Sequence, residues 1–166
     1  MSEQRAAHLM RKHRGAQPRV CVLDATNLKT KLELTIPSKI EAISPAVNRI
    51  MRLLKKDSCA PEHEFAVETV LREALANAIL HGNRQHPDKM VHVCCACDSV
   101  QGVLIVVQDE GEGFDPAKIP SPLLAEKIHS EGGRGIFLIN TLMDEVHVRR
   151  GGTEIYMRKA GGAGPH

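Results

Sequence analysis

The pattern of apolar and polar residues predicts a series of short strands and amphipathic helices. Residues 31–37 alternate polar and apolar side chains and end at a proline, which is typical of a half-buried strand. A Ser-Pro pair at 44–45 opens a region with apolar residues every three or four positions, which predicts a helix to about Lys56. A second region with this period, residues 61–81, predicts a longer helix that ends at Gly82.

Two further pairs of strands are predicted in the second half of the chain. Residues 90–97 and 103–108 have the apolar content of strands and are joined by a short turn. Residues 145–149 and 153–158 form the other pair, and Gly151-Gly152 between them is a hairpin signal.

The segment between the two strand pairs is first irregular and then helical. Residues 109–131 are rich in glycine and proline and too long for an ordinary connection, so we expect a lid or binding loop. A helix begins near residues 133–135. The order strand, helix, helix, strand, strand, lid, helix, strand, strand predicts an α+β fold, a two-layer sandwich. In it a mixed, mostly antiparallel sheet is covered on one face by about three helices.

Charge divides the chain into a basic leader and a mildly acidic body. Residues 1–31 carry seven Lys or Arg and two acids, net +5, and the remainder is net −3. We expect a leader at residues 1–30, one domain at residues 31–160 and a loose tail at residues 161–166. The leader is either a solvated flexible segment or an arm that touches nucleic acid or an acidic partner, and its run 20–23 could form a stray strand.

Composition excludes several classes of protein. Three Phe, one Tyr and no Trp argue against modules that stack nucleic-acid bases on aromatic side chains. The longest apolar run, Val103–Val107, is far shorter than the roughly 20 residues that span a bilayer. No apolar segment typical of a secretory signal follows the N-terminal charges. We therefore expect a cytoplasmic protein with no direct contact to nucleic acid or membrane.

The cysteines are expected to be reduced and buried. The chain has five, at positions 21, 59, 94, 95 and 97. An odd number in a cytoplasmic chain disfavours a disulfide framework. Strand alternation places Cys94 on the opposite face from Cys95 and Cys97, which disfavours a metal site. We interpret them as small hydrophobic residues of the core.

Three local motifs carry candidate chemistry, and the first is a polar ridge on the second helix. Glu73, Asn77 and His81 recur every four residues and therefore line up along one side of that helix. A carboxylate and an amide oxygen one turn apart can serve a proton transfer and a hard cation such as Mg²⁺. Taken alone, a ridge of this kind is more often the polar face of a surface helix.

The second and third motifs are rich in glycine. Residues 109–114, Asp-Glu-Gly-Glu-Gly-Phe, directly follow a predicted strand. The glycines allow the backbone to approach a ligand closely. The carboxylate at the end of the strand can accept a hydrogen bond from an exocyclic amine such as that of adenine. Residues 131–135, Glu-Gly-Gly-Arg-Gly, precede a helix whose unpaired N–H groups suit phosphates. The alternatives are an acid-rich turn and a plain hinge. Neither a P-loop nor a dinucleotide fingerprint is present.

The order and spacing of the three motifs resemble the histidine-kinase-like (GHKL) ATPase superfamily, and within it the anti-sigma factor serine/threonine kinases. The resemblance covers about residues 31–159. It implies a sheet-and-helix sandwich that binds ATP and Mg²⁺ between the Asn77 helix and a mobile lid. The lid, residues 115–130, is short, as in a small stand-alone kinase.

The resemblance also implies roles for individual residues. Glu73 corresponds to the general base and Asn77 to the Mg²⁺ ligand. Asp109 corresponds to the residue that binds the adenine amine, and His81 to a structural residue at the helix end. The other implied nucleotide-binding residues are Gly111, Gly113, Gly133, Arg134, Gly135 and Thr153. Arg134 would contact either phosphate or a partner, and Thr153 would support the adenine through water.

The function implied by the resemblance is that of a kinase and anti-sigma factor. Such a protein would transfer phosphate from ATP to a serine or threonine of a STAS-domain anti-anti-sigma factor. As a homodimer it would also sequester a sigma factor. The alternative is a nucleotide-dependent switch that binds partners without significant kinase activity. Glu73 disfavours this alternative, because a pure switch needs Asn77 and Asp109 but no base.

Overall fold

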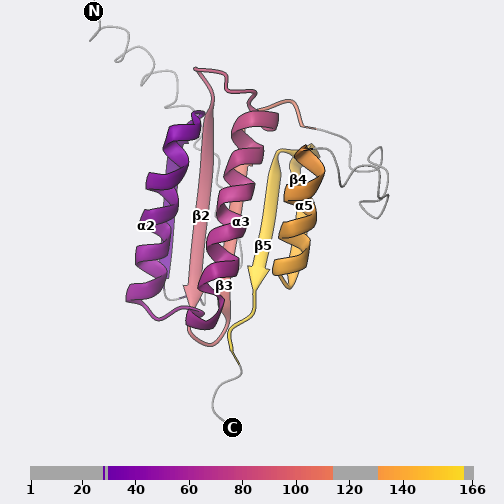
Figure 1. Cartoon of the computed structure of the whole chain (residues 1–166). Coiled ribbons are helices and arrows are strands. Elements are labelled where there is room, and N and C mark those ends of the chain that lie inside the picture. The colour runs from indigo at the N-terminus through magenta and orange to yellow at the C-terminus, as the bar shows by residue number, and fades with distance from the viewer. Residues whose placement is uncertain (1–27, 29, 114–130, 163–166) are drawn as a thin grey trace, which may run out of the picture.

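A five-stranded sheet covered on one face by three helices makes up the part of the chain that the computed structural model describes, which is residues 28, 30–113 and 131–162 (Figure 1). The strands are β1 (Thr30–Pro37), β2 (Met90–Asp98), β3 (Gly102–Asp109), β4 (Glu145–Arg149) and β5 (Glu154–Lys159). The helices are α2 (Ile43–Lys56), α3 (Glu64–Asn77) and α5 (Glu131–Leu142). Shorter elements are the 3₁₀ turns η2 (Ile40–Ala42), η3 (Pro61–His63) and η6 (Arg150–Gly152), and the π-helix η4 (Ala78–Gly82). The predicted α+β sandwich is confirmed.

The strand order brings the end of the chain into the middle of the sheet. The order is β1-β2-β3-β5-β4, and each of these neighbouring pairs is antiparallel. Strand β5 therefore lies between β3 and β4, and the β4–β5 hairpin joins the sheet along β3. Helix α5 precedes β4 in the chain and lies beside α3 over the same face of the sheet (Figure 1). Motifs far apart in sequence consequently meet between α3, α5 and the end of β3.

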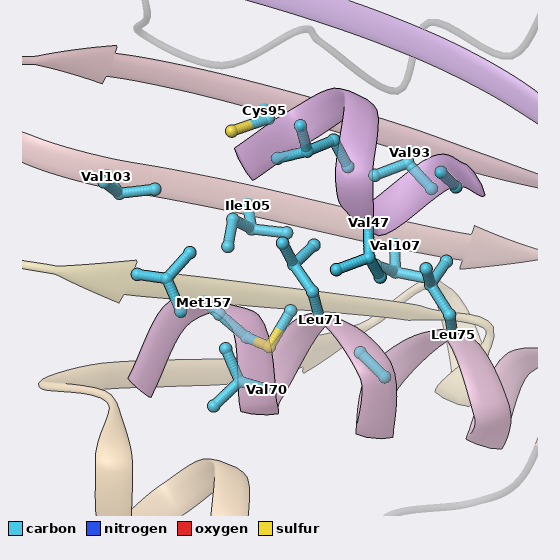
Figure 2. Close-up of a cluster of buried hydrophobic side chains, with 14 of the residues drawn as sticks. Val47, Val70, Leu71, Leu75, Val93, Cys95, Val103, Ile105, Val107 and Met157 are labelled. Carbon is cyan, nitrogen blue, oxygen red and sulfur yellow. The ribbon is translucent and has the colours of Figure 1, made fainter. Parts of the chain in front are cut away.

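The core fills the space between the helices and the inner face of the sheet. Side chains of α2 and α3 such as Val47 and Leu71 point at the strand residues Ile105 and Met157, and all four are fully buried (Figure 2). Burying an aliphatic side chain of this size contributes about 1.5–3 kcal/mol relative to exposure. In β1 the predicted alternation is observed, with Leu34 and Ile36 buried and Glu33, Thr35 and Pro37 exposed.

The second predicted helix is divided into three pieces in the structure. Residues 61–63 form the turn η3, α3 follows to Asn77, and residues 78–82 form a π-helix. Hydrogen bonds from Asn83 N–H to the Ala78 carbonyl and from Gln85 N–H to the Ile79 carbonyl continue beyond this wider turn. Such π-turns are rare and are frequent at functional sites. Here the wider turn comes directly after Asn77.

The predicted final hairpin is also observed, with a longer connection than two glycines. Strands β4 and β5 are joined by η6, in which Arg150, Gly151 and Gly152 have φ values of 50°, 65° and 93°. Glycine adopts such left-handed conformations without steric cost. The turn delivers Thr153 to the end of β3, where the Thr153 carbonyl accepts a hydrogen bond from Asp109 N–H at 2.9 Å.

The expectation that the cysteines are all reduced is wrong, because Cys59 and Cys97 form a disulfide. Their Cα atoms are 6.0 Å apart and their sequence separation is 38 residues, so local spacing gave no sign of the pairing. Cys95 is a buried free thiol, and burial raises its pKa to about 12. The predicted alternation is confirmed, since Cys95 and Cys97 belong to the core under the helices and Cys94 packs with Val106 and Tyr156 in a separate cluster.

Some predicted features lie outside the described residues. These are most of the basic leader at residues 1–30 with its run 20–23, the lid at residues 115–130, and the end of the tail at residues 161–166. None of the helices in the described part of the chain is long and apolar enough to span a membrane.

Candidate functional site

The polar ridge predicted on the second helix is present, and it faces the start of α5. Glu73 and Asn77 lie one turn apart on α3 and are half-buried. Among the described residues, Asn77 Nδ2 is one of the few buried side-chain polar atoms without a hydrogen-bond partner. A buried amide without a partner is costly, and such groups often mark the place of a ligand. His81 is exposed and belongs to the π-helix that follows.

The first turn of α5 packs directly against this acid–amide pair. A Cβ atom placed on Gly135 would lie 2.7 Å from Glu73 Oε2 and 3.2 Å from Asn77 Nδ2. Glycine is therefore the residue that lets the two helices approach without displacing Glu73. Gly133 and Arg134 belong to the same first turn of α5. The structure thus brings the first and third motifs together.

The second motif forms a wall at the end of β3. The Asp109 carboxylate accepts a hydrogen bond from Gly111 N–H at 2.8 Å. Burial raises the pKa of Asp109, although the Gly111 N–H bond and the positive charge of Lys89 both oppose that shift. Gly113 has a φ of 75°, and a Cβ there would overlap the Gly151 carbonyl. The second motif is therefore fixed against the β4–β5 hairpin.

Between these walls lies a cavity of about 330 Å³. Of the predicted site residues, it is lined by Asn77, Asp109, Gly113 and Thr153. The other lining residues are Ala74, Ala78, His81, Gly82, Arg84, Lys89, Val107, Glu112, Ile136, Val148, Gly152, Glu154 and Ile155. Apolar side chains alternate here with a few polar groups, as in small-molecule sites.

Several predicted site residues do not line this cavity. Glu73 and Gly135 lie beside Asn77, which does line it, and Gly111 donates a hydrogen bond from its N–H group to the Asp109 carboxylate. The Thr153 hydroxyl donates to the Arg150 carbonyl at 2.9 Å and thereby closes the hairpin turn. The cavity is thus formed by the motifs together, with some residues shaping it indirectly.

Asn83 is a structural residue of the site that sequence reasoning missed. Its side chain is buried, accepts from Glu110 N–H at 2.8 Å and donates to the Met90 carbonyl at 2.8 Å. The Glu110 carboxylate in turn accepts a hydrogen bond from Met90 N–H at 2.9 Å and pairs with His92 Nε2 at 3.0 Å. The end of η4, the start of β2 and the end of β3 are thereby joined. Only its position next to Gly82 pointed to Asn83 in the sequence.

Comparison with known proteins agrees with this arrangement. The family model described as histidine kinase-like ATPase domain matches residues 36–159. The chain belongs to this family.

Relatives of the chain include anti-sigma F factors of several bacteria. That of Heyndrickxia coagulans is 30% identical over 137 residues, which cover 80% of this chain and 93% of the relative. That of Clostridium novyi (strain NT) is 33% identical over 134 residues, which cover 78% of this chain and 93% of the relative. That of Geobacillus stearothermophilus is 35% identical over 100 residues, which cover 57% of this chain and 67% of the relative. An ATPase domain of this family binds nucleotide, and the cavity between α3, α5 and the end of β3 is the candidate site.

Proposed function

We propose that this chain is an ATP-dependent serine/threonine protein kinase that acts as an anti-sigma factor. It would phosphorylate a STAS-domain anti-anti-sigma factor and sequester a sigma factor. Membership of the histidine kinase-like ATPase family and the similarity to anti-sigma F factors support the proposal.

The observation that carries the proposal is the position of Glu73. Its carboxylate lies at the first turn of α5, one helical turn from Asn77, which lines the cavity together with Asp109. A nucleotide whose adenine amine donates to Asp109 would run its phosphates toward Asn77 and the N-terminus of α5. Unpaired N–H groups at a helix N-terminus suit phosphate oxygens.

The residues present fit a Mg²⁺ ion. The buried side-chain nitrogen of Asn77 makes no hydrogen bond. No bond through that nitrogen therefore fixes the amide, and the amide can turn its oxygen toward a cation. Mg²⁺ takes few ligands from the protein and the rest from phosphate and water. When bound, it would neutralise charge on the phosphates. No group of three or more His, Cys, Asp or Glu side chains in the described ranges is placed to hold a metal, which fits a site completed by the nucleotide.

The proposed reaction is an in-line phosphoryl transfer. The hydroxyl oxygen of the partner's serine or threonine attacks the γ-phosphorus, and the bond from that phosphorus to the β–γ bridging oxygen breaks. Glu73 accepts the hydroxyl proton, and ADP leaves with the electron pair of the broken bond. The protein contributes positioning and charge stabilisation. Asp109 would orient the adenine, Asn77 would hold the metal, and the glycine-rich start of α5 would hold the phosphates.

The wider role follows from the same proposal. The ATPase domain comprises residues 31–160 and works in the cytoplasm as a homodimer. The phosphorylation state of the STAS-domain partner would decide whether the partner or the sigma factor is bound.

One observation favours a second candidate, a nucleotide-dependent binding switch without significant kinase activity. Glu73 is not among the residues that line the cavity and instead lies against Gly135. In a switch, occupancy of the cavity alone would move α5 and change partner binding. The two candidates differ in whether phosphate is transferred.

The test is transfer of label from γ-labelled ATP to STAS-domain proteins of the same genome. The proposal predicts Mg²⁺-dependent label on serine or threonine with the wild-type chain, and strongly reduced label with Asn77→Ala. Glu68→Gln on the same helix is the control, because Glu68 pairs only with the partly exposed Arg72. Tight ATP binding without any label transfer would instead support the switch.

A further inference from the structure

Two cationic side chains line the cavity, and neither belongs to a motif of the sequence. Arg84 and Lys89 both come from the connection between η4 and β2. They are the only Lys or Arg side chains among the described residues that line this space. The carboxylates that line it are Asp109, Glu112 and Glu154.

The charge balance of the cavity makes these two cations significant. Glu154 is buried and paired with Arg150 at 2.9 Å, outside the lining set. Neither Arg84 nor Lys89 forms a salt bridge with a carboxylate of the described residues, although the charge of Lys89 acts on Asp109, so neither cation is held in a direct ion pair there. An anionic ligand would be repelled by the remaining carboxylates unless cations of this kind offset them.

The backbone that carries the cations is constrained. Arg84 and Gln85 have left-handed φ values of 51° and 54°. A non-glycine residue in this conformation is strained and persists only where its surroundings fix it. Here Gln85 N–H donates to the Ile79 carbonyl at 2.8 Å, and His86 N–H donates to the Asn83 carbonyl at 3.0 Å. Backbone held in rare conformations clusters at ligand-binding sites.

The position of the cations indicates which part of a nucleotide they would meet. Lys89 is close enough to Asp109 for its charge to act on that carboxylate. Arg84 lies two residues after Gly82, where an added Cβ atom would overlap the Asp109 carboxylate. Both cations are thus on the Asp109 side of the cavity. Glu73 and Asn77 lie on the side of α5, where the terminal phosphate would be.

We propose that Arg84 and Lys89 bind the α- and β-phosphates of the nucleotide. The inference rests on the proposed function only in taking the ligand to be an adenine nucleotide with its base at Asp109. The cations then contribute equally to the affinity for ADP and ATP and contribute nothing to the affinity for adenosine. Asn77 and the first turn of α5 would then distinguish ATP from ADP, because they would contact the γ-phosphate.

The experiment is competition of adenosine, ADP and ATP against a fluorescent ADP analogue on the full chain, with Mg²⁺ held constant. The variants are Arg84→Gln, Lys89→Gln and both together. Arg52→Gln is the control, because Arg52 is an exposed arginine of α2 that does not line the cavity. We expect each single variant to lower the affinity for ADP and for ATP about tenfold, which corresponds to the loss of one charged contact of about 1.4 kcal/mol. The double variant should lower the affinities for ADP and ATP about 100-fold and leave the affinity for adenosine unchanged.

Three outcomes would overturn the inference. These are an ADP affinity of the double variant within twofold of wild type, an equal loss for adenosine, and a loss confined to ATP. An equal loss for adenosine would indicate damage to the fold, and a loss confined to ATP would place the cations at the γ-phosphate. A wild-type chain that binds ADP but transfers no phosphate would defeat the kinase proposal and leave this inference standing.

Discussion

The side-chain amide of Asn83 holds the backbone of Glu110, through a hydrogen bond of 2.8 Å from Glu110 N–H to Asn83 Oδ1. The same amide donates to the Met90 carbonyl, so one buried side chain satisfies a backbone group of β2 and one of the residue that follows β3. Glu110 follows Asp109 directly. The orientation of the backbone beside Asp109 therefore depends on a residue directly after the π-helix.

Asn83→Ala should destabilise the fold. The substitution leaves the N–H of Glu110 and the carbonyl of Met90 without a partner, and each such group costs about 1–3 kcal/mol when buried. We expect the free energy of unfolding in urea to fall by about 2–4 kcal/mol. Asn140→Ala is the control, since the Asn140 side chain bonds only to its own helix at an exposed site. A loss below about 0.5 kcal/mol for Asn83→Ala, which is the range of ordinary surface substitutions, would contradict this role.

Gly135→Ala should separate activity from stability. The added methyl group would lie 2.7 Å from Glu73 Oε2, so the flexible carboxylate must move away from its place beside Asn77. Alanine favours a helix over glycine by up to about 1 kcal/mol, so the fold should be no less stable. Phosphotransfer kinetics and urea unfolding on one preparation check both parts. A kcat within twofold of wild type would show that the position of Glu73 at Gly135 is unimportant for the reaction.

Asp109 should make the chain less stable as the pH rises. Because burial raises its pKa above the ordinary 3.8, folding favours the protonated carboxyl. The stability that it contributes is present below pH 3.8 and is lost as the pH rises through the raised pKa. Asp109→Asn should therefore be more stable than wild type at pH 7, with the difference vanishing at acid pH. The same variant should bind ADP at least about tenfold more weakly, because it loses a charged hydrogen bond.

Asp144→Asn provides a control of opposite sign for the pH prediction. The Ala160 N–H bond first, and then Lys159, lower the pKa of Asp144. Its contribution is thus present above the ordinary pKa of 3.8 and is lost as the pH falls. Urea unfolding between pH 3 and 7 should show the two variants diverging from wild type in opposite directions. Parallel shifts would refute the assignment of the Asp109 pKa.

The Cys59–Cys97 disulfide should stabilise the oxidised chain. It closes a loop of 38 residues, for which the chain-entropy estimate is about 4 kcal/mol. Peptide mapping without reductant should recover the two cysteines in one linked species, and Cys59→Ser should lower the melting temperature only under oxidising conditions. Cys95 should resist alkylation in the folded chain, because it is buried and its pKa is about 12. Full alkylation of Cys59 in the unreduced native protein would exclude the bond.

Periodicity predicted most of the fold because each element has one apolar face. Strand β1 and helix α2 were predicted within one or two residues of their observed bounds. The ridge of Glu73 and Asn77 was likewise visible, because residues four apart share one side of a helix. Local pattern was sufficient wherever a contact joins neighbours in the sequence.

What the sequence did not predict depends on contacts between distant segments. The π-turn after Asn77 and the Asn83 bridge arise where η4 meets the ends of two strands. The Cys59–Cys97 bond joins the turn after α2 to the end of β2. Arg84 and Lys89 have no motif of their own, and only the path of the connection after η4 places them at the cavity.

The central claim is that Glu73 acts as the base for phosphoryl transfer from a nucleotide held between α3, α5 and the end of β3. The most direct measurement is the single-turnover rate of transfer from saturating Mg·ATP to the STAS-domain partner, with ATP affinity measured in parallel. We predict that Glu73→Gln binds ATP within about threefold of wild type and transfers phosphate at least about 100-fold more slowly, as expected for loss of a general base. A Glu73→Gln rate equal to that of wild type would contradict the account.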